Sequence, residues 1–320
     1  MKRLIIPLIV LAILIVLLLA ANTHGAKKAS DNPAVMRVVS TIFAPYDFAR
    51  VIAGNKADVS MLLPPGSETH SFEPTPQDII KIQKCDVFIY VGGESDKWVG
   101  EILKAVDTSR MRIITLMDCV SPVEEKIAEG MEKEEERRGS EADSPEYDEH
   151  VWTSPKNAEL IVRKITDAFC ETDAANADTY RQNAAEYTAK LDELDKGFER
   201  IVDGAKRRTI VFGDRFPFRY FADAYGLDYF AAFPGCSAET EASAATLKFL
   251  IDKINTSRIP VVFHIELASE KMARAISEAT GAKVLLLHSC HNISKADFEN
   301  GVSYLDLMTR NAVSLREALR

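Results

Sequence analysis

Compact metal and nucleotide motifs are missing from this sequence, and the residues that would build them are few. Only six of the 320 residues are histidine and five are cysteine. No two cysteines form a C-x-x-C pair, and the H-E-x-x-H pattern of zinc hydrolases does not occur. Gly92 and Gly93 follow an apolar run but lack the G-x-G-x-x-G spacing of a dinucleotide site, which favours a simple turn. A ligand site must therefore draw on residues from distant parts of the chain.

Basic surface is also scarce, and this limits the class of partner. The formal net charge is −9 and no run of Lys and Arg forms a basic stripe, so nucleic acid is not an expected partner. Between Glu124 and Glu149 there are 12 acidic and 4 basic residues, a local balance of −8. This composition is typical of a solvated loop, and a weak collector of cations is the alternative interpretation.

The five cysteines are an odd number, so at least one thiol has no partner within the chain. Cys85 begins a strand-like run and Cys170 lies in a helical pattern, and in both places we expect a small buried residue. Cys236 and Cys290 lie in polar, loop-like stretches. Whether these two form a disulfide stays open.

Residues 1–34 differ in character from the rest of the chain. Lys2 and Arg3 precede an apolar run from Leu4 to Ala21, which small and polar residues follow. This is the plan of an export signal, and at about 18 residues the run is also just long enough to remain as a membrane anchor. No Cys follows the run directly, so a lipid-modified N-terminus is not expected. With either a signal peptide or a signal-anchor, we expect the remainder to lie outside the cytoplasm.

Residues 35–174 alternate between short apolar segments and helix-length segments, with the acidic loop inserted at 124–149. The strand-like segments are Met36–Ser40, Ala57–Leu63, Val87–Val91 and Arg112–Leu116. The helical segments between them are Ala44–Ala53, Thr75–Lys84 and Asp96–Val106. This alternation predicts βαβ units and a mostly parallel sheet with helices on both faces, which is an N-terminal α/β lobe.

A long linking helix is predicted over residues 175–206, because Tyr180, Ala184, Tyr187 and Leu191 recur at spacings of three and four. Strands and helices then alternate again over residues 207–320. The strand-like segments there are Thr209–Phe212, Tyr229–Phe233, Val261–Glu266 and Val284–His288. The predicted fold class is α/β, with two lobes that each hold a mostly parallel sheet flanked by helices, joined by one long backbone helix.

Three histidines occupy comparable places in this pattern. His70 follows a strand and a Pro-Pro-Gly turn, His150 follows the acidic loop, and His288 closes a strand. The carboxyl ends of parallel strands meet at one edge of a sheet, so two such edges that face each other would bring the three imidazoles together. Neutral imidazole is the commonest ligand of zinc and related metals. The pattern predicts a metal site between the lobes.

Two stretches around these histidines carry a family resemblance. Residues 63–78, LPPGSETHSFEPTPQD, resemble a signature of the cluster A-I solute-binding proteins, which serve zinc and manganese ABC transporters. Residues 148–158, DEHVWTSPKNA, resemble the second signature of that family, in which a His precedes a Trp and a Pro. The order of first lobe, charged insertion, second histidine, long helix and second lobe is also similar, and the resemblance covers Met36 to Leu319.

The resemblance implies a metal bound between two lobes that close only slightly around it. By position, His70 and His150 are the implied ligands of the first lobe, and His288 takes the place of the family's last ligand. Glu266 matches a glutamate that is common near the family's site. Its implied role is to orient a histidine or to fix the loop.

The second lobe departs from the family pattern at one position. Where the family usually has a third histidine before an aromatic stretch, this chain has Arg215. A guanidinium group has no lone pair to offer and cannot be a ligand. The fourth ligand therefore stays open among Asp214, Glu266, Cys290, His291 and water.

The function that the resemblance implies is that of an exported binding component of a metal ABC transporter. It would capture a divalent transition metal, zinc in preference to manganese, and deliver it to a membrane permease. We expect a monomer without enzyme activity, in the periplasm or at the outer face of the cytoplasmic membrane. A zinc-dependent hydrolase and a surface adhesion protein of the same fold are the alternatives, and the lack of an obvious general base beside the histidines argues against the first of these.

Overall fold

Both predicted sheets are present in the computed structural model, which describes residues 35–67, 72–131, 146–235, 237 and 242–320. The apolar run Leu4–Ala21, His70 and Cys236 lie outside the described residues. Within the described ranges, no helix is long and apolar enough to cross a bilayer.

Each lobe holds a four-stranded sheet in which all neighbouring strands are parallel. The first sheet has the order β2-β1-β3-β4, with β1 Met36–Ser40, β2 Ala57–Met61, β3 Val87–Tyr90 and β4 Arg112–Thr115. The second has the order β6-β5-β7-β8, with β5 Thr209–Phe216, β6 Asp228–Pro234, β7 Val261–His264 and β8 Lys283–Leu286. The predicted α/β fold class with two parallel sheets is confirmed.

Helices follow most strands, as parallel connections require. In the first lobe they are α2 Phe43–Ala53, α3 Pro76–Lys84, α4 Lys97–Ala105 and α5 Pro155–Thr172. In the second lobe they are α7 Arg219–Tyr225, α8 Ala244–Ser257, α9 Lys271–Thr280, α10 Lys295–Glu299 and α11 Tyr304–Ala318. The N-terminus of α3 is fixed by a capping box, in which the Thr75 hydroxyl accepts from the Asp78 N–H and the Asp78 carboxylate accepts from the Thr75 N–H.

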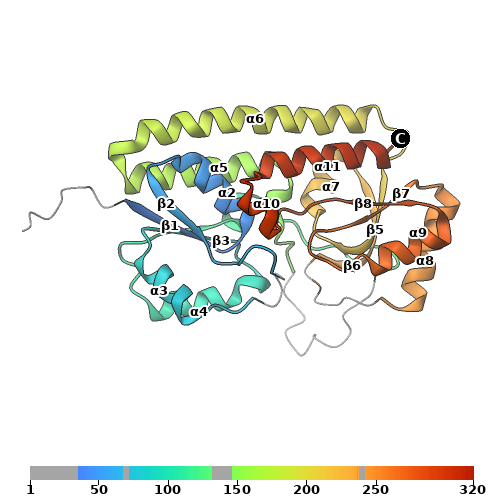
Figure 1. Cartoon of the computed structure of the whole chain (residues 1–320), viewed down its shortest axis with the longest axis horizontal. Helices are drawn as coiled ribbons and strands as arrows, with labels where there is room; N and C mark the ends of the chain where they lie inside the picture. Colours follow the sequence, from blue (N-terminus) through green and yellow to red (C-terminus); the bar gives the residue numbers. More distant parts are fainter. Residues whose placement is uncertain (1–34, 68–71, 132–145, 236, 238–241) are drawn as a thin grey trace, which may run out of the picture. The chain divides into compact units, whose positions relative to one another are not determined.

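The long helix α6, Ala177–Asp203, lies alongside both lobes. It packs on α5 of the first lobe and on α11, which ends the second lobe (Figure 1). Its 27 residues correspond to about 40 Å at the usual rise. Tyr180, Tyr187 and Leu191 are buried along its inner face, as the spacing predicted.

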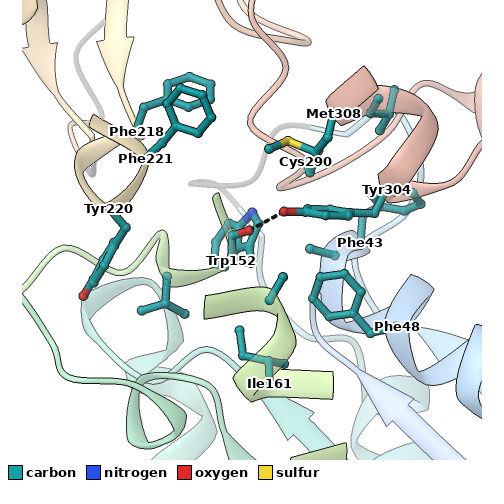
Figure 2. Close-up of a cluster of buried hydrophobic side chains, with 14 of the residues drawn as sticks. Phe43, Phe48, Trp152, Ile161, Phe218, Tyr220, Phe221, Cys290, Tyr304 and Met308 are labelled. Atoms are coloured by element: carbon teal, nitrogen blue, oxygen red, sulfur yellow. Dashed lines mark hydrogen bonds between the residues drawn. The ribbon is translucent and has the colours of Figure 1, made fainter. Parts of the chain in front are cut away.

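One hydrophobic cluster extends through both lobes. It joins residues on one face of each sheet with α2, α5, α6, α7 and α11. Figure 2 shows part of it, with Phe43 and Phe48 of the first lobe and Phe218 and Phe221 of the second on opposite sides of Trp152. Two smaller clusters fill the outer layers, one under α3 and α4 and one under α8 and α9. The two sheets are therefore held on a common core.

Several strand ends differ from the sequence-based prediction, and two of them bear on the cavity described below. Strand β5 continues beyond Phe212 to Phe216, with an irregular register opposite β6 in between. Strand β8 ends at Leu286, so the prediction that His288 closes this strand was wrong. His288 lies in the loop that follows, where alternation along the strand no longer determines its direction.

Candidate metal centre

A small cavity of about 20 Å³ lies where the ends of the two sheets meet. Ser67 and His150 of the first lobe line it, together with Arg215, Glu266, His291 and Asn292 of the second. A space of this size holds about one water molecule. Imidazole nitrogens and a carboxylate at its wall are donors that a single metal ion can use.

His150 lies at the wall of this cavity because the chain enters a short turn of 3₁₀ helix, Val151–Thr153, directly after it. The side chain is 2% exposed, and Asp148 Oδ1 lies 2.8 Å from the His150 backbone nitrogen and 3.2 Å from the ring Nδ1. The carboxylate is an acceptor, so Nδ1 carries the hydrogen and Nε2 keeps its lone pair. This is the arrangement that prepares a histidine to bind a metal through Nε2.

The electrostatic surroundings of His150 favour positive charge. Burial opposes protonation of the ring, but the neighbouring carboxylates of Asp148, Glu149 and Glu125 outweigh burial and raise the pKa of His150 above its usual value. A site that stabilises an imidazolium also stabilises a metal cation.

The rings of His150, Trp152 and His291 pack against one another. The His150 centroid lies 5.6 Å from that of His291 and 5.5 Å from that of Trp152, and the Trp152–His291 separation is 5.1 Å. Gly235 lets the backbone approach His150 closely, since a Cβ there would lie 3.2 Å from Cε1 of the ring. The structure thus brings one histidine from each lobe to one cavity.

Glu266 fixes the loop that carries His291. Its carboxylate accepts hydrogen bonds from the Ser289 N–H at 2.7 Å, the Ser289 hydroxyl at 2.6 Å and the His291 N–H at 3.2 Å. These contacts agree with the predicted role of Glu266 in fixing the loop. Within this loop Cys290 has φ +61°, a conformation that costs energy for a residue with a side chain and persists because its surroundings hold it.

His288 is also held firmly, although it is not part of the cavity wall. Asn311 accepts from the His288 N–H at 2.7 Å and donates to the His288 carbonyl at 2.7 Å. The ring Nδ1 accepts from the Cys290 N–H at 3.0 Å and lies 3.6 Å from Glu266 Oε2. Because the lone pair of Nδ1 is used, only Nε2 of His288 is available to a metal.

Arg215 and Asp214 have structural contacts in the second lobe. Arg215 lines the cavity, and its guanidinium donates to the Ser237 carbonyl at 3.3 Å. Asp214 is buried and accepts from the backbone N–H groups of Arg215 and Ile265. Burial raises the pKa of Asp214. Its carboxylate binds backbone groups within β5 and directly after β7, and it does not line the cavity.

The ligand set remains incomplete in the described part of the chain. His70 lies outside it, and among the described residues no three His, Cys, Asp or Glu side chains are grouped closely enough to hold a metal ion. Cys290 is a buried free thiol, and its possible partner Cys236 is not described. Burial also raises the pKa of the Cys290 thiol well above its usual value, which disfavours the thiolate.

The two ends of the acidic stretch are paired and attached to the second lobe. Glu124 and Tyr147 form an antiparallel bridge, and the Asp148 N–H donates to the Val123 carbonyl at 3.0 Å. The hydroxyl of Tyr220 accepts from the Val123 N–H and donates to the Asp148 carbonyl. This stem therefore fixes Asp148, two residues before His150, by contacts within the described part of the chain.

Sequence reasoning missed two features of the site. The sequence pattern does not single out Asp148 beyond its place in a signature, although a carboxylate two residues before a histidine can turn back to its ring. His291 was kept only as one of several candidates for the fourth ligand, because spacing alone does not show which residue of H-S-C-H faces the cavity.

Several known proteins are similar to this chain in sequence. A model of the family described as "Zinc-uptake complex component A periplasmic" matches residues 38–318. The high-affinity zinc uptake system protein ZnuA of Bacillus subtilis is 31% identical over 315 residues, which are 98% of this chain and 97% of that protein. The zinc-binding lipoprotein AdcA of Streptococcus pneumoniae is 30% identical over 97% of this chain, which spans 60% of the length of AdcA.

Solved structures are similar as well. The metal-dependent lipoprotein YcdH from Bacillus subtilis aligns with a TM-score of 0.74 and 29% identity, covering 89% of this chain and 100% of that one. The Zn(II)-bound ZnuA-like domain of Streptococcus pneumoniae AdcA aligns with a TM-score of 0.72 and 28% identity, covering 89% and 98%.

Proposed function

The chain belongs to the family of periplasmic zinc-uptake complex component A proteins, and from that membership we propose that it captures a divalent transition metal outside the cytoplasm and delivers it to the permease of an ABC transporter. Zinc is the proposed cargo in preference to manganese. Imidazole ligands suit zinc, whereas manganese takes more carboxylate and water.

The observation that carries this proposal is the pair of histidines at the interlobe cavity. His150 is buried with Nδ1 facing Asp148, and the ring of His291 lies 5.6 Å away by centroids. The two residues are 141 positions apart and come from different lobes, so a cation held by both would join the lobes.

We propose His70 and His150 as ligands from the first lobe. For the second lobe, the lining of the cavity favours His291, and His288 is the alternative through its Nε2. Arg215 stands where the family usually has a ligand, and its fixed charge would have to be balanced by Glu266 at the same cavity.

The protein acts in this proposal as a carrier without catalysis. The two lobes are taken as residues 35–174 and 207–320, joined by the helix of residues 175–206, and the monomer meets its permease outside the cytoplasm. The family membership supports an extracytoplasmic place, and an uncleaved N-terminal segment would tether the chain to the membrane.

Calorimetric titration of residues 35–320 with zinc and with manganese tests the proposal. We expect one zinc ion per chain, bound tightly, and weaker binding of manganese. His150→Ala should weaken zinc affinity by well over about tenfold, because one lost ligand removes several kcal/mol. His291→Ala and His288→Ala decide between the two second-lobe donors, and His264→Ala, outside the cavity, is the matched control.

Absence of zinc binding by the wild-type chain would contradict the proposal. Turnover of ester or amide substrates by the zinc-loaded chain would instead support the hydrolase alternative.

A further inference from the structure

In the loop after β8, the side chain of Asn292 is hydrogen-bonded to the first lobe. Asn292 is 0% exposed, and its Nδ2 donates to the carbonyl oxygens of Pro64 at 3.0 Å and Ser67 at 2.8 Å. Its Oδ1 accepts from the Ile293 N–H at 2.8 Å. A carboxamide nitrogen has two hydrogens, and both have acceptors in the same first-lobe turn. The side chain is therefore held in one orientation by contacts on both lobes.

A backbone hydrogen bond supports the same contact. The Gly66 N–H donates to the Ile293 carbonyl at 2.8 Å. Gly66 has φ +81°, which a residue with a side chain rarely adopts, and a Cβ there would lie 3.4 Å from the side chain of Lys295. We call Pro64–Ser67 together with Asn292 and Ile293 the interlobe clasp.

The interlobe clasp forms part of the cavity wall. Ser67 and Asn292 line the cavity with His150 and His291, and His291 directly precedes Asn292 in the chain. Displacement of Asn292 would therefore move both the first-lobe turn and a proposed ligand. A cation bound in the cavity would therefore lie directly beside residues of the interlobe clasp.

The common core determines which movement can admit or release an ion. Wide separation of the lobes would disrupt the hydrophobic cluster that passes through both of them. Separation of the clasp breaks only the hydrogen bonds that Asn292 and Gly66 donate at one edge. The second movement exposes far less apolar surface, so it is the cheaper route to the cavity.

We propose that Asn292 is a positioning residue, whose carboxamide holds the Pro64–Ser67 turn against the second lobe and thereby sets how fast a metal ion leaves the cavity. The inference rests on the proposed function for the identity of the cargo. The contact itself is tested separately below.

The variant Asn292→Asp tests this assignment in residues 35–320. Aspartate has the same shape and keeps an acceptor for Ile293, but it places an oxygen where the Pro64 and Ser67 carbonyls now receive N–H groups. We expect zinc release into excess chelator, followed by stopped-flow, to be faster by about tenfold or more, since two buried acceptors lose their donor. For the uncharged variant Asn292→Ser the association rate should change by less than about threefold, because its diffusional encounter with the ion is unaltered. Asn292→Ser, which adds no charge, should act in the same direction, and the exposed Asn300→Asp should leave both rates unchanged.

Amide hydrogen exchange at Gly66 tests the clasp without metal. Its N–H should be protected in the wild-type chain and should exchange faster in Asn292→Asp, while the amides of β1 exchange as before. An unprotected Gly66 in the wild type would overturn the proposal even if neither variant folds. Unchanged zinc release in a folded variant, or faster release without faster exchange at Gly66, would also overturn it. If the wild type binds no zinc, the proposed function fails while Gly66 exchange still decides whether Asn292 holds the clasp.

Discussion

At the scale of single residues, Asp148 governs the state of the His150 imidazole. A metal binds only the neutral ring, so protons compete with it. The Asp148 carboxylate raises the pKa of His150 against the effect of burial, and affinity should therefore begin to fall at a pH above the usual histidine range. As pH decreases through that raised pKa, the imidazolium form takes over and zinc is lost.

Asp148→Asn should change both the strength and the pH profile of zinc binding. At pH 8 the affinity should be weaker by about 10- to 100-fold, which is typical when a partner behind a metal ligand is removed. Without the carboxylate, burial lowers the pKa of His150, so the decline in affinity should shift to lower pH. Dissociation constants measured from pH 8 to pH 5 check this, and identical profiles for variant and wild type would show that Asp148 does not act on the ring.

Individual residues were predicted unevenly from the sequence. His150 was found because its neighbours form a recognisable signature, and the structure places it at the cavity. The choice between His288 and His291 was not predictable, because both lie in a loop beyond Leu286, where no periodicity fixes side-chain direction. Glu266 was assigned to fixing this loop, and its three hydrogen bonds agree with that role.

At the scale of elements, the turn between β3 and α4 depends on a buried carboxylate. Asp96 Oδ2 accepts from the Val91 N–H at 2.7 Å and from the Gly92 N–H at 3.4 Å. Burial and the nearby Glu149 raise the pKa of Asp96 to about 6, from an ordinary value of 3.8. The folded state thus holds this proton more tightly than the unfolded state, so the free energy of unfolding should decrease as pH rises from about 4 to about 6.

Asp96→Asn should remove this pH dependence, because one amide oxygen can accept both hydrogen bonds and does not ionise. A shift of about two pKa units corresponds to about 3 kcal/mol. Between pH 4 and pH 7 the free energy of unfolding should therefore decrease more in the wild type than in the variant, by up to that amount. Urea unfolding at both pH values measures the difference. The exposed Asp118→Asn is the control, and equal pH slopes for Asp96→Asn and wild type would contradict the prediction.

The stem of the acidic stretch predicts how a deletion will behave. Tyr220 holds Val123 and Asp148, which lie on either side of residues 132–145. Replacement of residues 132–145 by a short Gly-Ser linker should therefore leave zinc affinity within about threefold of wild type, since the stem still places His150. Calorimetry on the shortened chain checks this, and loss of tight binding would show that the removed carboxylates belong to the site.

Elements were more predictable than their exact ends. All eight predicted strands are present in the structure, because short β-branched and apolar runs between helical segments strongly favour strands. The extension of β5 to Phe216 was not predicted, since Gly213 and the charged pair Asp214 and Arg215 are not typical of a strand interior. Tertiary contacts hold them there: a Cβ on Gly213 would lie 2.7 Å from the backbone of Ala273 in α9.

At the scale of the whole described molecule, the common core could not be predicted from sequence. Periodicity shows which face of an element is apolar but not which lobe that face meets. In the structure the Tyr304 hydroxyl, at the start of α11, donates to the Trp152 carbonyl of the first lobe (Figure 2). The Trp152 indole in turn donates to the Ser289 carbonyl of the second lobe. Trp152 therefore links the lobes by two hydrogen bonds within apolar surroundings.

A common core makes the two lobes unfold together. Phe218, in the second lobe, is 1% exposed within the shared cluster, and Phe218→Ala should lower the free energy of unfolding by about 3–5 kcal/mol. The only two tryptophans, Trp98 and Trp152, belong to the first lobe, so their fluorescence reports that lobe, whereas far-UV circular dichroism reports both. For a single cooperative unit the two signals should shift by the same amount in urea and remain coincident. If the dichroism instead splits into two steps while the fluorescence midpoint stays at its wild-type value, the lobes unfold independently. The common core would then not restrict opening for the metal to the interlobe clasp.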